Sequence, residues 1–221
     1  MKNEQQFVKS KQRVADHGEV FTQPREVNAM LDLVKEETER IESRFLEPAC
    51  GTGNFLVEIL RRKLDVVERR YKRSQFDCER FSFLAVSSMY GIDILMDNVI
   101  ECRNRLLEQY KEWYISLYKK TYKEEQLIAI EFLLHRNILW GDALTLETPE
   151  ATPKPIIFSE WSLVSSTQVQ RRDFSLDMLL RSQPMEGDNL FSDLGEEAFI
   201  PTPFRTFPLC HFLKVANEFS S

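Results

Sequence analysis

The sequence predicts an α/β fold with a mostly parallel central sheet and helices on both faces. Three observations indicate this class. Short apolar runs alternate with longer amphipathic stretches over roughly the first 160 residues. A glycine pair, Gly51 and Gly53, separates the first apolar run from the amphipathic stretch after it. No apolar run approaches the roughly 18 residues that a membrane-spanning helix needs.

Each element has a local justification. From Pro24 to about residue 41, apolar side chains recur at three- and four-residue spacing, and proline suits the first turn of a helix. A short strand within 43–49 stops at Pro48, and a proline-rich loop precedes a strand at 156–161. Further helices are expected at about 54–72, 96–121 and 124–135, and further strands within 81–94 and 137–144.

After residue 161 the pattern weakens. We expect loops over 162–199 with one short helix near 175–181, and a final helix within 207–219. The chain then divides into an N-terminal arm (1–20), a main domain (21–161) and a continuation of that domain (162–221).

Charge and cysteine usage narrow the class of protein. The formal charge of −6 disfavours binding of phosphate backbones, so contact with nucleic acid would need a local basic surface or a partner. Basic stretches lie at 60–64, 68–73 and 169–174, although solvated helix faces are the simpler interpretation. Four separated cysteines without a CxxC pair indicate neither zinc nor disulfides. Without an apolar secretory signal, we expect a cytoplasmic protein that does not enter a membrane.

The glycine pair indicates a ligand that approaches the main chain closely. A dinucleotide-binding turn has a third glycine, and here Leu56 occupies that position. No GKS or GKT follows, which excludes a phosphate-binding P-loop. S-adenosylmethionine, which carries no pyrophosphate, fits such a turn. A tight turn with no ligand is the alternative.

Three acidic residues strengthen the ligand hypothesis. Glu47, Asp93 and Asp142 each stand at the end of an expected strand, and ligands of open α/β sheets bind at the carboxyl ends of strands. Their carboxylates suit a cationic amino group, ribose hydroxyls and an adenine amine, respectively. Gly91 and Gly141 lie near the same turns, as close ligand approach would require.

These motifs, in this order, resemble the S-adenosylmethionine-dependent DNA adenine-N6 methyltransferases of restriction–modification systems, especially the type I and type IIG branch. The matching stretches are HGEVFTQP (17–24), EPACGTGNFL (47–56), GIDI (91–94) and GDAL (141–144). The resemblance implies a Rossmann-like methyltransferase fold, with 21–161 as the domain that binds S-adenosylmethionine. The cofactor-binding residues that it implies are Phe21, Thr22, Glu47, Pro48, Ala49, Cys50, Gly51, Gly53, Asn54, Phe55, Asp93, Ile94, Asp142 and Ala143.

The catalytic motif of that family, Asn-Pro-Pro-Tyr after the fourth strand, is absent. Its asparagine and proline carbonyl accept hydrogen bonds from the target amine, and its aromatic ring stacks on the flipped adenine. The fourth expected strand ends in Ser159, Glu160 and Trp161 instead. Glu160 is a candidate acceptor and Trp161 a candidate stacking platform. The alternative is that Trp161 packs into a core while Glu160 faces solvent or a partner.

Three functions remain open. The first is a methyltransferase acting on the adenine amine of DNA, by direct transfer and without a metal, with a separate subunit supplying sequence recognition. The second is a non-catalytic cofactor-binding partner in a restriction or defence complex. The third is a methyltransferase for protein or RNA.

Overall fold

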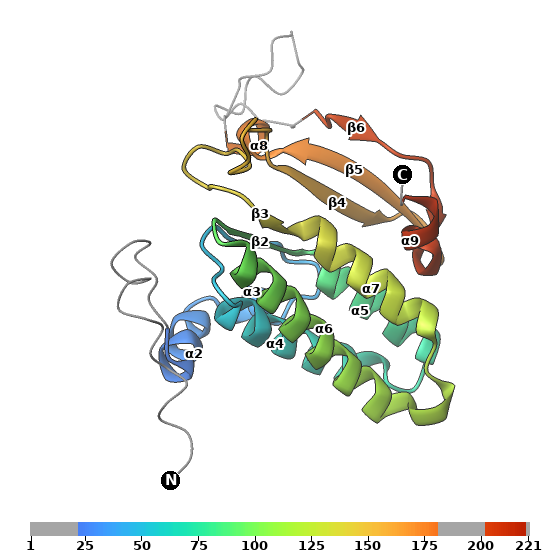
Figure 1. The fold of residues 1–221 in the computed structure, drawn as a ribbon. Helices are drawn as coiled ribbons and strands as arrows, with labels where there is room; N and C mark the ends of the chain where they lie inside the picture. Colours follow the sequence, from blue (N-terminus) through green and yellow to red (C-terminus); the bar gives the residue numbers. More distant parts are fainter. Residues whose placement is uncertain (1–21, 181–201, 220–221) are drawn as a thin grey trace, which may run out of the picture.

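The computed structural model describes residues 22–180 and 202–219 (Figure 1). The expected N-terminal arm and Phe21 lie outside these residues. The fold is mixed α/β, with a three-stranded parallel sheet, a group of helices and a second sheet that is antiparallel.

The parallel sheet contains β1 (Phe45–Glu47), β2 (Met89–Asp93) and β3 (Ile138–Trp140) in the order β1-β2-β3. The strands expected within 43–49, 81–94 and 137–144 are thereby confirmed. All five residues of β2 are buried, because the strand lies between its two neighbours with both faces covered. Glu47 pairs in register with Gly91, and Asp93 with Trp140, so the strand ends meet at one edge.

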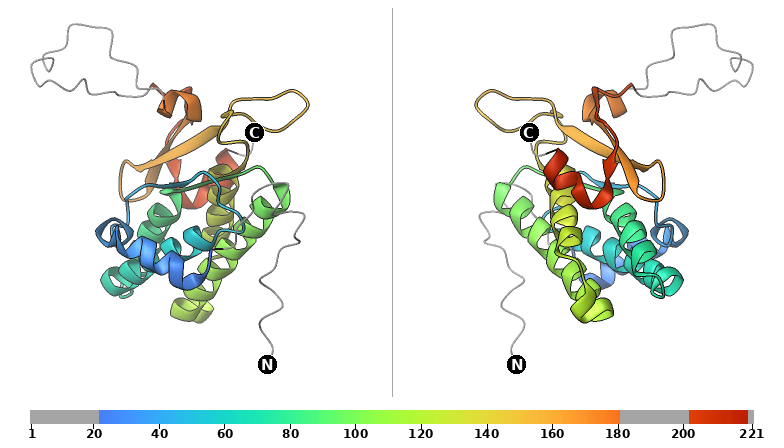
Figure 2. Two further views of the ribbon diagram at one scale, coloured as in Figure 1. Left: turned by 90° about the vertical axis from the view of Figure 1, so that its left-hand side faces the viewer. Right: turned by 90° about the vertical axis from the view of Figure 1, so that its right-hand side faces the viewer.

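Four helices connect these strands. The chain passes through α4 (Asn54–Tyr71) and α5 (Gln75–Ser87) between β1 and β2. It passes through α6 (Met96–Tyr118), the 3-10 turn η1 (Lys119–Thr121) and α7 (Glu124–Asn137) between β2 and β3. Figures 1 and 2 show α4 to α7 gathered on one side of the parallel sheet.

An apolar face holds these helices against the sheet. Leu56, Ile59, Leu60 and Leu64 recur along α4 at helical spacing and are buried. The expected helix over 24–41 is divided into α2 (Pro24–Asp32) and α3 (Lys35–Thr38).

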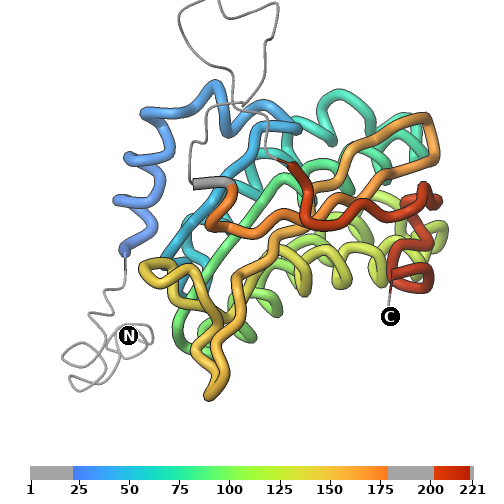
Figure 3. Tube along the Cα trace, turned by 90° about the horizontal axis from the view of Figure 1, so that it is seen from above, coloured from blue at the N-terminus to red at the C-terminus, as the bar shows by residue number. Residues whose placement is uncertain are grey.

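The two faces of the parallel sheet are covered differently, by helices on one side and mainly by the antiparallel sheet on the other, and a Rossmann-like methyltransferase fold is not confirmed. On the face opposite α4, Tyr90 and Ile92 of β2 pack with Ile156, Phe158 and Leu176. These residues come from the second sheet and its flanks, and in Figure 3 its strands pass across the helical layer. No helix lies between β3 and the fourth strand, so a crossover element that would make that strand parallel is missing.

The second sheet is built on a hairpin. The fourth expected strand is β4 (Ile157–Leu163), and it pairs antiparallel with β5 (Gln168–Ser175). The short strands β6 (Arg205–Thr206) and β7 (Cys210–His211) both pair with β5. The short elements around them are α8 (Leu176–Leu180), η3 (Phe212–Lys214) and α9 (Val215–Glu218).

The assignment of 162–199 to loops is therefore wrong over β5, whereas the short helix near 175–181 is confirmed. The expected final helix within 207–219 is reduced to η3 and α9. Residues 181–201 lie outside the described residues.

Two of the three basic stretches each contain one buried cation. In 60–64, Arg61 pairs with Glu58 and Asp65, and Lys63 is fully buried. In 169–174, Arg171 is buried with Asp173. The basic side chains of 68–73 are exposed. No helix among residues 22–180 and 202–219 is long and apolar enough to cross a bilayer.

Candidate functional site

The site expected from the sequence lies at the edge where β1, β2 and β3 end, hereafter the carboxyl edge. It comprises Glu47, the turn 48–53, Asp93, Ile94 and the start of the segment after β3, at Asp142. Because the strand order is β1-β2-β3, these groups follow one another along the sheet.

The turn after β1 has the conformation that its glycines were expected to permit. Gly51 and Gly53 have positive φ angles of 52° and 88°, where side chains are strained. The N–H of Cys50 donates to Ile92 O at 2.8 Å, which attaches the turn to β2. Among residues 22–180 and 202–219, a Cβ atom built on Gly51 has no neighbour within 4 Å. The main chain at Gly51 is therefore open on that side, as close ligand approach requires.

The other three glycines at this edge are explained by packing. A Cβ atom on Gly53 would lie 2.6 Å from Cys102 Sγ on α6. A Cβ on Gly91 would lie 2.9 Å from Leu56 Cδ1, and one on Gly141 would lie 2.4 Å from Ile156 Cδ1. Of the four, Gly51 alone faces open space in the described structure.

Asp93 is buried and makes three hydrogen bonds within the protein. Its Oδ2 accepts from the N–H of Gly51 at 2.8 Å. Its Oδ1 accepts from the N–H of Leu95 at 2.9 Å and from Asn98 Nδ2 at 3.1 Å. A carboxylate has about four lone-pair positions, so about one remains for a ribose hydroxyl. Two ribose hydroxyls, as expected from the sequence, exceed this capacity.

Asp142 is half-buried beyond the end of β3. Its Oδ1 accepts from the N–H of Leu144 at 2.8 Å, which closes a local Asx turn. Its Oδ2 has no hydrogen-bond partner within the described ranges. Ala143 packs on the opposite face of the sheet, with Leu146. Ile94 is 48% exposed, and its carbonyl accepts from Trp140 Nε1 at 2.8 Å.

Glu47 is a half-buried carboxylate without a cation. Within residues 22–180 and 202–219 its one hydrogen bond is a long one, from the N–H of Ala49 at 3.5 Å. Burial raises the pKa of Glu47 above its ordinary value, and the bond from Ala49 opposes this shift. A cationic ligand beside Glu47 would oppose this shift, because a nearby positive charge favours the ionised carboxylate. Pro48 and Ala49 are exposed.

Of the remaining residues expected to bind the cofactor, some are hydrogen-bonded near the turn and others are packed in the core. Asn54, the first residue of α4, donates from Nδ2 to Thr22 O at 3.1 Å, so these two residues do meet. Phe55 packs against the core. Cys50 is buried, and its pKa is raised by a hydrogen bond with the Cys102 thiol and by burial.

Glu160 and Trp161 do not join this group. Glu160 pairs with Arg44, which precedes the first residue of β1, and with Arg172 at 3.8 Å. Trp161 is 5% exposed, and its ring lies 6.1 Å from the ring of Phe83 in α5. Arg44 directly precedes β1, and Phe83 lies in α5, which leads into β2. Glu160 and Trp161 therefore lie toward the opposite edge of the parallel sheet. Trp161 thus occupies a core position.

Sequence reasoning missed two residues that support this edge. Asn98 donates to Asp93, and Arg105 on α6 donates to the turn after β1. Both lie within a long helix at positions typical of solvated polar residues, so no local pattern distinguishes them. Among the residues with described positions, no three His, Cys, Asp or Glu side chains are grouped to hold a metal ion.

Comparison with known proteins returns no match: no family model, no curated protein and no solved structure is similar to this chain.

Proposed function

We propose that the carboxyl edge binds S-adenosylmethionine, as in the DNA adenine-N6 methyltransferases that the sequence motifs resemble. The observation that carries the proposal is the open main chain at Gly51 beside Glu47, a half-buried carboxylate with no cation among the described residues. An open backbone next to an uncompensated acid suits a ligand that is both close-fitting and positively charged.

The strand order sets the orientation of the cofactor in this proposal. Glu47 at the end of β1 would hold the ammonium of the amino-acid half. Asp93 at the end of β2 would accept one ribose hydroxyl with its remaining lone pair. Asp142 beyond β3 would accept from the adenine amine. The exposed side chain of Ile94 offers an apolar surface for the adenine ring.

Methyl transfer to an adenine amine of DNA is the proposed reaction, in which the bound cofactor supplies an activated methyl group. The residues of this chain would bind and orient that cofactor. A second requirement is an acceptor for the protons of the target amine. Glu160 and Trp161, the candidates from the sequence, lie toward the opposite edge of the sheet.

That placement favours a second candidate function, a cofactor-binding partner in a restriction or defence complex whose target-base site belongs to another subunit. In both functions the cofactor site is the same. They differ in whether this chain alone turns over.

Calorimetry with S-adenosylmethionine and S-adenosylhomocysteine tests the shared claim. We expect saturable binding with one site per chain, and no heat of binding to folded protein would refute it. Incubation with methyl-labelled cofactor and mixed-sequence DNA separates the two functions. Label in DNA from the pure chain supports the enzyme, and label only with co-expressed neighbouring gene products supports the partner subunit. Parallel samples with RNA and protein test those acceptors.

A further inference from the structure

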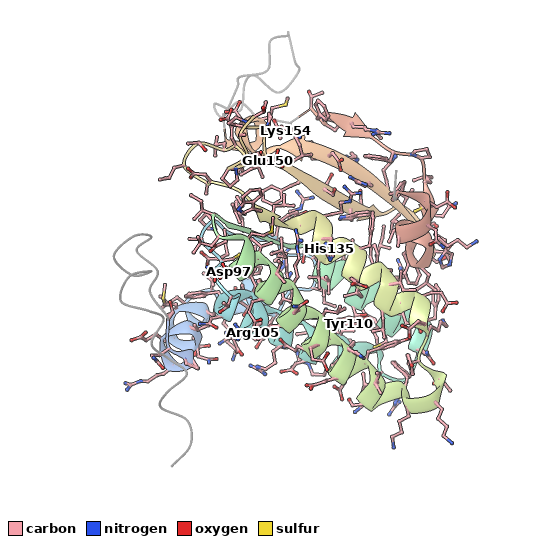
Figure 4. All side chains as sticks on the ribbon, viewed as in Figure 1. Asp97, Arg105, Tyr110, His135, Glu150 and Lys154 are labelled. Carbon is pink, nitrogen blue, oxygen red and sulfur yellow. The ribbon has the colours of Figure 1, made fainter. Side chains whose placement is uncertain are left out.

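Arg105 of α6 is hydrogen-bonded to the turn 48–53, although it is not itself one of the residues of the carboxyl edge. Its Nη1 donates to Thr52 O at 2.6 Å, to Thr52 Oγ1 at 3.2 Å and to Asn54 Oδ1 at 2.9 Å. Figure 4 labels Arg105 where α6 lies beside α4. One guanidinium nitrogen therefore holds the residue between the two glycines together with the first residue of α4.

Asn54 extends this contact to a third segment. While its Oδ1 accepts from Arg105, its Nδ2 donates to the carbonyl of Thr22 at 3.1 Å. Thr22 lies two residues before α2 begins. The chain of hydrogen bonds Arg105–Asn54–Thr22 thus connects α6, the start of α4 and the segment that leads into α2.

The turn needs such a restraint. Gly51 and Gly53 lose more conformational freedom on ordering than other residues do. The N-cap residue of α4 is Gly53, which has no side chain that could cap the helix. Asp93 holds the turn at Gly51, and Arg105 holds it at the next residue, Thr52. The rigid, planar guanidinium is well suited to hold several acceptors in one geometry.

We propose that Arg105 is a positioning residue for the amino-acid half of the bound cofactor, acting through Thr52, Asn54 and Thr22. The inference rests on the proposed function, in which Glu47 at the β1 end of the edge binds the ammonium group. Arg105 holds the turn that follows β1, whereas Asp142 lies beyond β3. Its influence is therefore directed at the amino-acid half and not at the adenine.

A purely structural role for Arg105 makes a different prediction. If the side chain only attached α6 to α4, its loss would lower the stability of the fold. It would also weaken the binding of every ligand at the carboxyl edge to the same degree. If it positions the turn for the amino-acid half, its loss acts only on ligands that possess that half.

The experiment compares two ligands on the full chain. S-adenosylhomocysteine contains the amino acid, and 5′-methylthioadenosine contains the adenosine and sulfur without it. Calorimetry of Arg105→Met should show S-adenosylhomocysteine binding about tenfold more weakly, since charge-assisted hydrogen bonds that order the turn are lost. Binding of methylthioadenosine should change less than about twofold, as expected when no contact to that half is altered. Arg105→Lys, which keeps a cationic donor, should restore part of the lost affinity.

Arg103→Met is the matched control. Arg103 is also on α6 and also donates to a main-chain carbonyl, that of Ile138 at the start of β3, at 2.9 Å. This variant should leave the ratio of the two dissociation constants unchanged, and thermal unfolding of each variant identifies any that does not fold. The inference would be overturned if Arg105→Met lost the same affinity for both ligands, or lost affinity for neither. If the unmodified chain binds neither ligand, the proposed function itself fails.

Discussion

The main-chain N–H of Gly51 donates to Asp93 Oδ2 at 2.8 Å, and this hydrogen bond joins the turn after β1 to the end of β2. The other carboxylate oxygen of Asp93 accepts from the N–H of Leu95, in the connection to α6. One buried side chain thus orders two neighbouring turns of the carboxyl edge. An acid at this position organises the site whether or not a ligand is present.

Replacement of this acid should affect both folding and binding. In Asp93→Asn, one oxygen remains as an acceptor, but the amide nitrogen faces donors and the charge is lost. We expect unfolding free energy and cofactor binding each to fall by about 1–3 kcal/mol. Denaturant unfolding and calorimetry measure the two effects. Glu108→Gln, at an exposed acid of α6, controls for the loss of charge. Unchanged stability and affinity in Asp93→Asn would contradict this role.

The two glycines of the turn should respond differently to alanine. Both have positive φ, so each substitution costs about 1 kcal/mol of backbone strain. In Gly53→Ala the new methyl group also meets Cys102 Sγ, and such overpacking adds about 1–3 kcal/mol. In Gly51→Ala the methyl group has no neighbour within 4 Å in the described part of the chain, so beyond the strain the loss should be concentrated in cofactor binding.

Unfolding and binding measured on the two variants test this contrast. The double variant Gly53→Ala with Cys102→Ala should recover part of the stability lost in Gly53→Ala, because the colliding sulfur is removed. Equal stability of the two single variants would contradict the packing assignment of Gly53.

The first half of the fold could be predicted because its signals are local. The run that forms α4 has its apolar residues at helical spacing, and the glycine turn before it has the expected positive φ angles. The direction of β4 depends instead on the connection 141–156, which contains no helix. Strand direction is a long-range property, and no periodicity within β4 encodes it.

Strand β5 was missed because two of the buried side chains on one of its faces, next to Val169, are charged. Arg171 and Asp173 point to the same side, pair at 2.8 Å and contact Ser159 across the hairpin. In sequence they look like a solvated basic stretch, since pairing between neighbouring strands cannot be seen there. The role of Arg105 was equally hidden, because its acceptors lie about 50 residues away in the chain.

Cofactor binding should depend on pH through Glu47. Burial raises the pKa of this carboxyl, so it takes up a proton at higher pH than an exposed glutamate. A protonated Glu47 no longer attracts an ammonium group. We therefore expect the affinity for S-adenosylhomocysteine to fall as the pH is lowered through this raised pKa. Calorimetry across the acidic range, on folded protein, measures the effect.

The control is Glu47→Gln, which should bind more weakly at neutral pH and should lose this part of the pH dependence. Identical pH profiles for the two proteins would exclude Glu47 as the partner of the ligand ammonium.

Lys63 gives the fold itself a dependence on pH. The side chain is fully buried in α4, and its Nζ donates to Ile41 O at 3.0 Å, to Ser43 O and to Ser88 Oγ. No carboxylate pairs with it among the described residues. Burial lowers the pKa of Lys63 from 10.5 to about 7. In the unfolded chain the ordinary value returns.

Between about pH 7 and pH 10.5 the unfolded state therefore binds more protons at Lys63 than the folded state does. Unfolding free energy should rise with pH in this range, by up to about 1.4 kcal/mol per pH unit from this group. Below pH 7 the lysine is charged in both states, and the cost of burying the charge is fully present.

Denaturant unfolding of the unmodified chain and of Lys63→Met between about pH 7 and pH 10.5 isolates the effect, because all other titrating groups are shared. The difference between the two stabilities should move in favour of the unmodified chain as the pH rises, and a difference independent of pH would show that Lys63 keeps its proton when folded.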